Sequence, residues 1–147
     1  MKRLALCLIA CWTLWQVSAA EGDWLTDLPK AQTKAKADKK MVLVDFNGSN
    51  WCPPCKVLRK KVLNSQAFID YAKTNLVLVD IDFPDPSNQT EELKKTNEAL
   101  STKYNVEGLP TVIVFSSDGK ELKRIVGYEG ESPEKFIAQL EKLKHQS

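Results

Sequence analysis

The sequence predicts one α/β domain, a three-layer α/β/α sandwich with a mixed central sheet. Two continuous apolar runs, at residues 41–46 and 76–82, are typical of strands that are buried on both faces. Segments with helical character separate these runs, as parallel strands require. Two further runs joined by a short turn predict an antiparallel hairpin, and a closing helix follows. With 147 residues and 43% hydrophobic content, the chain has enough apolar material for one core.

The expected helices begin at recognisable residues. They are residues 21–40, 53–64, 66–74, 90–104 and 133–144. Pro29 suits the first turn of the first helix. Ser65 and Ser132 are expected to cap the helices that follow them, because a serine side chain accepts a hydrogen bond from a free backbone N–H.

The expected strands end at turn residues. They are residues 41–46, 76–82, 111–115 and 121–126. Pro84 and Pro86 end the second strand, since proline cannot continue a strand ladder. Asp118 and Gly119 are expected in the hairpin turn, because an Asp-Gly pair readily adopts the positive backbone angles that tight hairpins need.

The first twenty residues have the layout of a secretory signal. Lys2 and Arg3 precede an apolar stretch that is shorter than the roughly 20 residues of a membrane-spanning helix. Small residues up to Ala20 complete the pattern. We expect cleavage after Ala20, a mature domain of residues 21–147, and a periplasmic or secreted protein.

A second interpretation of the same segment is a lipoprotein. Residues 8–11 resemble the site at which bacterial lipoproteins are cleaved and lipidated, here on Cys11. Only seven apolar residues precede Cys11, however, and the chain stays apolar beyond it as far as Val17. We therefore favour signal cleavage over an anchor at Cys11.

Charge and cysteine content narrow the function. Removal of Lys2 and Arg3 leaves 19 basic against 19 acidic residues, which argues against nucleic acid or an anionic membrane as partner.

Only Cys52 and Cys55 remain in the mature chain. A pair three residues apart closes too small a loop to stabilise the fold much, so we interpret it as chemical. No cofactor or metal is expected, because a zinc site usually needs four ligands and the single histidine, His145, lies in the polar tail.

Four motifs together resemble the thioredoxin superfamily: Trp51-Cys52-Pro53-Pro54-Cys55-Lys56, Val44-Asp45-Phe46, Gly108-Leu109-Pro110-Thr111 and Gly127. The similarity spans about residues 42–143. The insert at about residues 83–97 is most similar to that of small exported bacterial thioredoxin-like proteins. The resemblance implies a thioredoxin fold and a thiol-disulfide oxidoreductase.

The cysteine pair opens a helix, which suits it to disulfide exchange. A thiolate is the nucleophile, and the positive end of a helix stabilises negative charge at Cys52. The spacing brings Cys55 within bridging reach and is expected to leave Cys52 exposed. Cys52 then attacks, and Cys55 resolves the mixed disulfide.

The resemblance also implies roles for five other residues. Asp45 would assist deprotonation of Cys55, Pro110 would be a cis-proline facing the pair, and Trp51, Leu109 and Gly127 would border a substrate groove. A strand-end Asp45 facing water and an ordinary Gly-x-Pro turn are the alternatives. Six residues separate Asp45 from Cys52, one more than in thioredoxin, and the 76–82 strand lacks thioredoxin's partner lysine.

The direction of the reaction stays open at this level. Pro54 matches reducing thioredoxins, whereas Pro53 is shared with strongly oxidising periplasmic enzymes. The histidine that those oxidants and isomerases place before the second cysteine is missing, so a reductase or general exchange enzyme is favoured over an oxidant or isomerase. A non-enzymatic binding module, chaperone-like or copper-handling, is the other class. We expect protein thiol or disulfide substrates, a membrane electron donor and a monomer.

Overall fold

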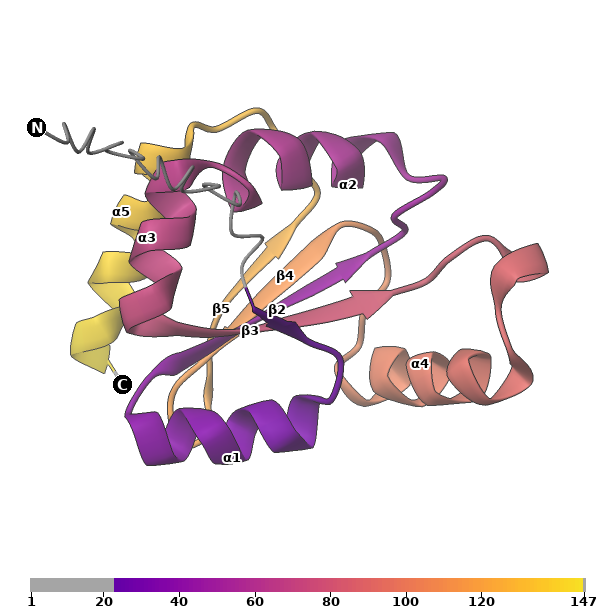
Figure 1. The fold of residues 1–147 in the computed structure, drawn as a ribbon, viewed down its shortest axis with the longest axis horizontal. Coiled ribbons are helices and arrows are strands. Elements are labelled where there is room, and N and C mark those ends of the chain that lie inside the picture. Colours follow the sequence, from indigo (N-terminus) through magenta and orange to yellow (C-terminus); the bar gives the residue numbers. More distant parts are fainter. Residues whose placement is uncertain (1–22, 147) are drawn as a thin grey trace, which may run out of the picture.

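A five-stranded sheet forms the centre of the computed structural model, which describes residues 23–146 (Figure 1). The strands are β1 (Trp24–Leu25), β2 (Met41–Asn47), β3 (Leu76–Asp82), β4 (Thr111–Phe115) and β5 (Glu121–Val126). Their order is β1-β3-β2-β4-β5. β2 is parallel to β3 and antiparallel to β4, which confirms the mixed sheet. The expected signal segment and Cys11 lie outside the described residues.

Helices cover both faces of the sheet. They are α1 (Leu28–Asp38), α2 (Pro53–Leu58), the π-helix η1 (Arg59–Leu63), α3 (Gln66–Asn75), the 3-10 helix η2 (Pro86–Asn88), α4 (Glu91–Lys103), α5 (Pro133–Leu143) and the 3-10 helix η3 (Lys144–Gln146). One core lies between the sheet and the layer of α2, η1, α3 and α5. The other lies between the sheet and α1, with side chains from α4 at its margin. The three-layer sandwich is therefore confirmed.

The first helix starts later than the sequence predicted. Trp24 and Leu25 do not extend it but form β1, which pairs with Leu78 and Val79 at the edge of β3. Asp27 then caps α1 by accepting a hydrogen bond from the Lys30 N–H at 2.9 Å. The cap at Asp27 and the pairing of β1 with β3 explain why the helix begins at Leu28 and not earlier.

The helix expected at residues 53–64 contains a π turn. The Asn64 N–H donates to the carbonyl of Arg59, five residues back, at 2.8 Å. The wider turn lets the adjacent Val62 and Leu63 both be buried. Arg59, the first residue of η1, follows α2 without a break in the helix.

The remaining elements lie close to their expected positions. Ser65 and Ser132 cap α3 and α5 as predicted. The hairpin of β4 and β5 is also confirmed, although only Gly119 of the Asp-Gly pair has a positive φ, 86°. No helix within residues 23–146 is long and apolar enough to cross a membrane.

The core beneath α5 gives a test of the packing. Phe136 is 1% exposed and meets Phe68 edge to face. Phe136→Ala is expected to lower the free energy of unfolding by about 3–5 kcal/mol, because a cavity replaces the ring. Urea unfolding measures this. Leu93→Ala, on the exposed side of α4, is the control and should cost about 0.5 kcal/mol or less; equal losses would contradict the assigned core.

Candidate active site

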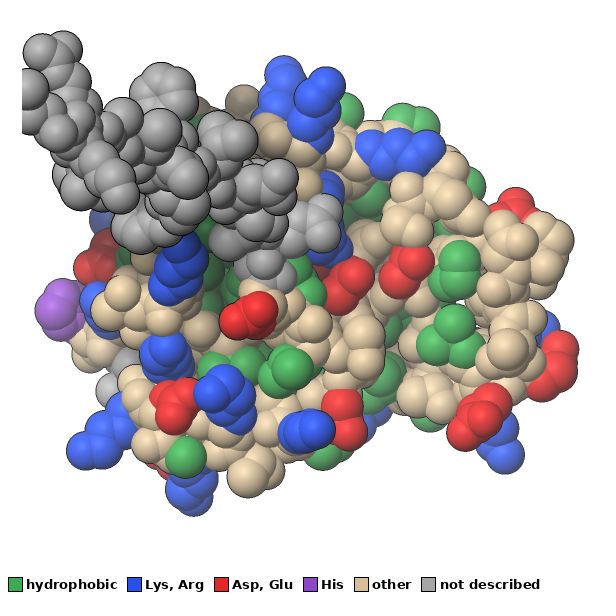
Figure 2. All heavy atoms as spheres, viewed as in Figure 1, with side chains coloured by type: hydrophobic (Ala, Val, Ile, Leu, Met, Phe, Trp, Pro, Cys, Tyr) green, Lys and Arg blue, Asp and Glu red, His purple; other side chains and the backbone are tan. Residues whose placement is uncertain are grey.

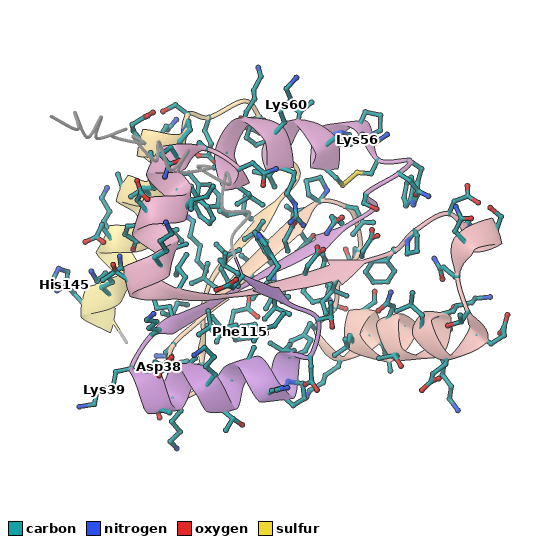
Figure 3. All side chains as sticks on the ribbon, in the orientation of Figure 1. Asp38, Lys39, Lys56, Lys60, Phe115 and His145 are labelled. Atoms are coloured by element: carbon teal, nitrogen blue, oxygen red, sulfur yellow. A yellow bond between two sulfur atoms is a disulfide. The ribbon has the colours of Figure 1, made fainter. Side chains whose placement is uncertain are left out.

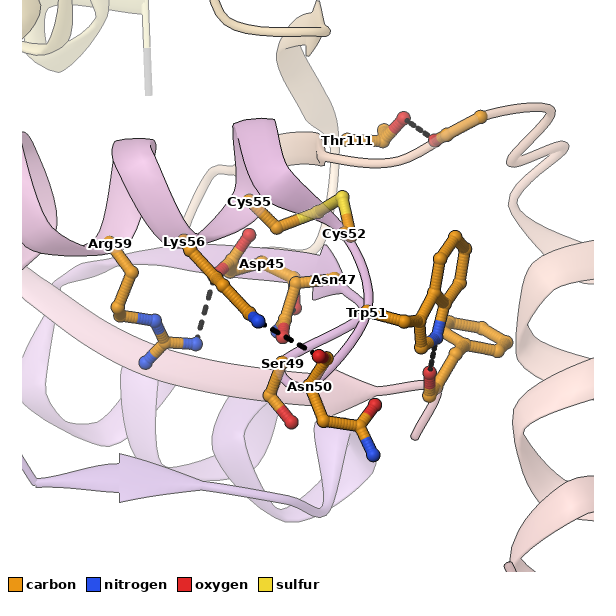
Figure 4. The surroundings of a disulfide bond; sticks show 12 residues. Asp45, Asn47, Ser49, Asn50, Trp51, Cys52, Cys55, Lys56, Arg59 and Thr111 are labelled. Carbon is orange, nitrogen blue, oxygen red and sulfur yellow. Dashed lines mark hydrogen bonds and ion pairs between the residues drawn. A yellow bond between two sulfur atoms is a disulfide. The ribbon is translucent and has the colours of Figure 1, made fainter. Parts of the chain in front are cut away.

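Cys52 and Cys55 form a disulfide at the start of α2 (Figure 4). Their Cα atoms are 5.3 Å apart. Cys52 is the N-cap residue, with extended backbone angles, and its N–H donates to the carbonyl of Gly48 at 3.0 Å. The pair therefore sits where a strand ends and a helix begins, as the sequence predicted.

Cys52 is not exposed in this disulfide form, which corrects the prediction. It is 3% exposed and Cys55 is 4% exposed. The sulfur of Cys52 is bonded to that of Cys55 in the first turn of α2, and α2 packs on the sheet. The preceding residue, Trp51, is by contrast 52% exposed.

Two prolines limit the hydrogen-bond donors near Cys52. An N-cap side chain accepts from the N–H of the second or third helical residue. Pro53 and Pro54 occupy the first two positions of α2 and have no N–H. The N–H of Cys55, in the third position, is the donor that the first turn leaves for a Cys52 thiolate.

Asp45 is buried beneath this helix. It is 2% exposed, and so the alternative of a water-facing acid is wrong. It lies two residues after Leu43 in β2 and therefore on the same face of the sheet, and Leu43 belongs to the core under α2 and α3. Its Oδ2 atom accepts from Arg59, whereas Oδ1 is buried without a hydrogen-bond partner.

Sequence reasoning missed the partners of Asp45. Arg59 Nη2 lies 2.9 Å from Asp45 Oδ2 and 2.6 Å from Asp80 Oδ1. The Arg59 guanidinium also lies over the ring of Trp24, 4.3 Å from its centroid. Asn47 Nδ2 donates to the same Asp80 oxygen at 2.6 Å. An arginine from the helix layer thus provides the cation that the sequence analysis did not find in the 76–82 strand.

The environment of Asp45 favours its protonated form. Burial, above all, raises the pKa of Asp45 to about 7, and the charges of Asp80 and Asp82 act in the same direction. The charge and hydrogen bond of Arg59 oppose them. A carboxyl group that titrates near neutral pH can take up and release a proton during exchange.

A cleft of about 580 Å³ reaches this cluster from the surface. Cys55, Arg59, Asp80 and Trp24 are among its lining residues. No group of three or more His, Cys, Asp or Glu side chains in residues 23–146 is arranged to hold a metal ion. Lys56 and Lys60, both on the helix that begins with the cysteine pair, also line the cleft (Figure 3), and Lys56 Nζ donates to the Asn50 carbonyl at 2.8 Å.

The segment after β3 holds the loop that carries Trp51. The Trp51 indole N–H donates to the carbonyl of Phe83 at 2.7 Å (Figure 4). Asp82 accepts from both the N–H and the hydroxyl of Ser49, at 2.8 and 2.6 Å. From α4, the buried Asn97 donates to the Asp82 carbonyl at 2.6 Å. The insert therefore braces the loop that presents the cysteine pair.

The residues expected to border a groove are partly brought together. The Leu109–Pro110 peptide bond is cis, as the motif predicted. The Gly127 N–H donates to the Pro110 carbonyl at 2.8 Å, which ties the end of the β4–β5 hairpin to the proline loop. Thr111, the next residue, lies in the surroundings of the disulfide (Figure 4).

The surface around the site has no field of a single sign. Lysine and arginine side chains alternate with acidic ones over the visible face (Figure 2). This mixture agrees with the equal numbers of basic and acidic residues, 19 each, in residues 21–147. This face therefore shows no concentrated basic patch that could recognise an acidic partner.

Comparisons with known proteins agree with the geometry. A model of the thioredoxin-like domain matches residues 28–144. Disulfide bond reductase DsbH of Chlamydia pneumoniae is 33% identical over 113 residues, which are 77% of this chain and 67% of that protein. Thioredoxin-related protein DsbJ of the same organism is 33% identical over 109 residues, 74% of this chain but only 31% of the length of DsbJ.

Solved structures give the same result. A DsbH oxidoreductase superposes with a TM-score of 0.76 at 25% identity, covering 100% of this chain and 96% of that one. The oxidised C-terminal domain of Neisseria meningitidis DsbD has a TM-score of 0.59 at 26% identity, covering 81% of this chain and 97% of that one.

Gly48 gives a test of the Trp51 loop. A Cβ at this position would lie 2.7 Å from the Trp51 ring, so Gly48→Ala is expected to displace the indole and break its bond to Phe83. The indole N–H should then exchange with solvent at least about tenfold faster, as followed by NMR. Gly108→Ala, where a Cβ meets nothing within 4 Å, is the control. Unchanged exchange in Gly48→Ala would refute the assigned contact.

Asp45 should make stability depend on pH. The unfolded chain releases this proton near pH 3.8 and the folded protein near pH 7, so the free energy of unfolding falls as pH rises through this window. Asparagine lacks that loss. Asp45→Asn therefore changes the free energy of unfolding of the oxidised protein differently at the two ends of this window. The change is expected to be roughly 1–3 kcal/mol more favourable to the variant at pH 8 than at pH 5, measured by urea unfolding. Asp70→Asn, on the exposed side of α3, is the control and should change the free energy of unfolding by the same amount at both pH values. If Asp45→Asn also gave the same change at pH 5 and pH 8, titration of Asp45 in this window would be excluded.

Proposed function

We propose that this chain, which belongs to the thioredoxin-like domain family and is a thiol-disulfide oxidoreductase, acts outside the cytoplasm as a reductase or general exchange enzyme for protein disulfides. The family match and the fold confirm the resemblance predicted from the sequence. The observation that carries the proposal is the Cys52–Cys55 disulfide at the start of α2.

The donors around Cys52 support the reducing direction. Extra stabilisation of the attacking thiolate favours the reduced dithiol and makes a pair more oxidising. Pro53 and Pro54 remove two N–H groups from the first turn, and Lys56 Nζ donates to the Asn50 carbonyl, 2.8 Å away. A modestly stabilised thiolate gives up its electrons more readily. The name of the C. pneumoniae relative, a disulfide bond reductase, points the same way.

The reaction proceeds in two exchanges. The Cys52 thiolate attacks a substrate disulfide, forms a mixed disulfide and releases one substrate thiolate. Asp45 then accepts the proton of the Cys55 thiol, and the Cys55 thiolate attacks the Cys52 sulfur. The second substrate thiolate leaves, and two electrons have passed to the substrate. A dithiol donor returns the Cys52–Cys55 disulfide to the reduced pair by the reverse exchanges.

Substrate recognition would rely mainly on backbone. The exposed indole of Trp51 would border one side of the substrate groove, and the Pro110 loop, which Gly127 holds through a hydrogen bond, would border the other. An extended segment around a substrate cysteine would pair with the backbone of Leu109. Such recognition tolerates many client sequences.

The proposal includes the setting in which the enzyme works. Residues 1–20 would direct export and be removed after Ala20, and residues 21–147 would act as a monomer. Re-reduction requires an electron source outside the cytoplasm, for which a membrane electron-donor protein is the proposed partner. DsbD proteins, named thiol:disulfide interchange proteins, are among the relatives of this chain.

Insulin reduction tests the activity. The purified mature domain is expected to reduce insulin disulfides with turnover when dithiothreitol supplies electrons, and Cys52→Ser should abolish it. Cys55→Ser should instead accumulate a mixed disulfide with its substrate, because no resolving thiol remains. The proposal is wrong if the wild-type domain shows no turnover. If Cys52→Ser then binds a protein partner as well as the wild type does, the chain is a binding module that does not need its thiols.

The reduction potential tests the direction. We expect a value nearer to about −270 mV, as in thioredoxin, than to about −120 mV, as in DsbA. Pro54→Ala restores an N–H at the second helical position and should make the potential about 30 mV less negative, the equivalent of about 1.4 kcal/mol of thiolate stabilisation. Pro53→Ala, at the first position, is the matched control and should shift it less. A strongly oxidising wild-type value would establish an oxidant or isomerase.

A further inference from the structure

One arginine serves two carboxyl groups beneath the active-site helix. The same nitrogen, Arg59 Nη2, lies 2.9 Å from Asp45 and 2.6 Å from Asp80. We propose that Arg59 and Asp80 are positioning residues that set how readily Asp45 accepts the proton of Cys55, with Asp80 competing against Asp45 for the guanidinium. This inference rests on the proposed role of Asp45 in the exchange reaction.

The geometry of three elements creates this competition. Asp45 and Asp80 are direct partners in the parallel pairing of β2 with β3, so both side chains stand on the face that α2 and η1 cover. Arg59 follows Cys55 by four residues, about one helical turn, and therefore reaches the same face. The ring of Trp24, from β1, holds the guanidinium from its other side.

The two carboxyl groups do not share the arginine equally. Asp80 has the shorter contact, and Asn47 fixes the same Asp80 oxygen with a second hydrogen bond. Its side chain is 29% exposed, whereas that of Asp45 is 2% exposed. Asp45 receives only part of the arginine's charge, and its Oδ1 atom has no hydrogen-bond partner. An incompletely neutralised buried carboxylate has a strong tendency to bind a proton.

The other charged groups near Asp45 complete this environment. Among the described residues, Lys56 of α2 and Lys60 of η1 line the cleft beside the cluster, and Asp82 lies two residues beyond Asp80 on the same strand. On the opposite side, β4 pairs the uncharged Val112 with Asp45. Cys55 is the proton donor. Arg59 is the cation in direct contact with Asp45, and Asp80 is the carboxyl group that competes with Asp45 for it.

The competition matters at the resolving step. Before proton transfer the cluster holds two carboxylates and one guanidinium, hence one net negative charge. After the Cys55 S–H bond breaks and the proton reaches Asp45, the cluster is neutral and Cys55 carries the negative charge. Asp80 thus makes Asp45 a better proton acceptor than Arg59 alone would allow. The cleft that touches Cys55, Arg59 and Asp80 gives the proton a route to solvent afterwards.

Two substitutions should act in opposite directions. Asp80→Asn keeps the shape of the side chain but leaves Arg59 to Asp45, so the titration midpoint of Asp45 should fall by about one pH unit, a tenfold loss of proton affinity. Arg59→Gln removes the opposing charge and should raise the midpoint by at least as much. The carboxyl carbon of Asp45, followed by NMR in the oxidised chain, reports both shifts. Asp80→Glu, which restores the charge, should return the midpoint toward that of the wild type.

The pH dependence of disulfide closure is the second measurement. In the reduced chain, the pH at which closure with a small disulfide reaches half its maximum rate should move in the same two directions. Asp82→Asn is the matched control, because Asp82 holds Ser49 and makes no contact with Arg59; its shift should be smaller than that of Asp80→Asn. Shifts of equal sign, or none, in Asp80→Asn and Arg59→Gln would overturn the proposal.

The two proposals can fail separately. Opposite Asp45 shifts in a protein that does not reduce insulin would support the coupling and reject the reductase function. Normal insulin turnover with unmoved Asp45 midpoints would reject the coupling and retain the function.

Discussion

The parallel register of β2 with β3 is the constraint on which the site depends. It pairs Asp45 with Asp80, and the alternation of strand side chains directs both carboxyl groups beneath the same helix. Two acids on a covered face require a cation, and Arg59 provides it from η1. The core on this face excludes water from Asp45, and this burial raises its pKa to about 7. The packing of the sheet and the raised pKa of Asp45 therefore follow from the same strand register.

Most of the fold was predictable because its main elements are marked by local patterns. The apolar runs of β2 and β3, the serine caps and the hairpin turn each depend on a few neighbouring residues. β1 was missed because two residues cannot show an alternation, and it exists only because the edge of β3 offers backbone partners. The π turn at Arg59 has no periodic signal either. It follows from burying the adjacent Val62 and Leu63 against a sheet that the local sequence does not reveal.

The site divides in the same way between local and distant signals. The cysteine pair, Asp45 and the cis-proline lie in short motifs, whereas the link between Arg59 and Asp80 joins segments 21 residues apart. One signal could have found it. Residues 41–46 and 76–81 share a Val-Leu-Val-Asp sequence, which aligns Asp45 with Asp80 once the two strands are taken as parallel neighbours. An arginine one helical turn after Cys55 then becomes the natural partner of both.

The polar groups of the site are distributed unequally between the two cysteines. Around Cys52 the first helical turn offers a single N–H, since prolines occupy its first two positions. Beside Cys55 lie a buried carboxyl group, a shared arginine and a cleft to the surface. A stabilised Cys52 thiolate would hold electrons back, whereas the proposed acceptance of the Cys55 proton by Asp45 would speed resolution of the mixed disulfide. If the proposed reductase function is correct, this arrangement would favour release of a reduced client, and the resolving step at Cys55 would control the reaction.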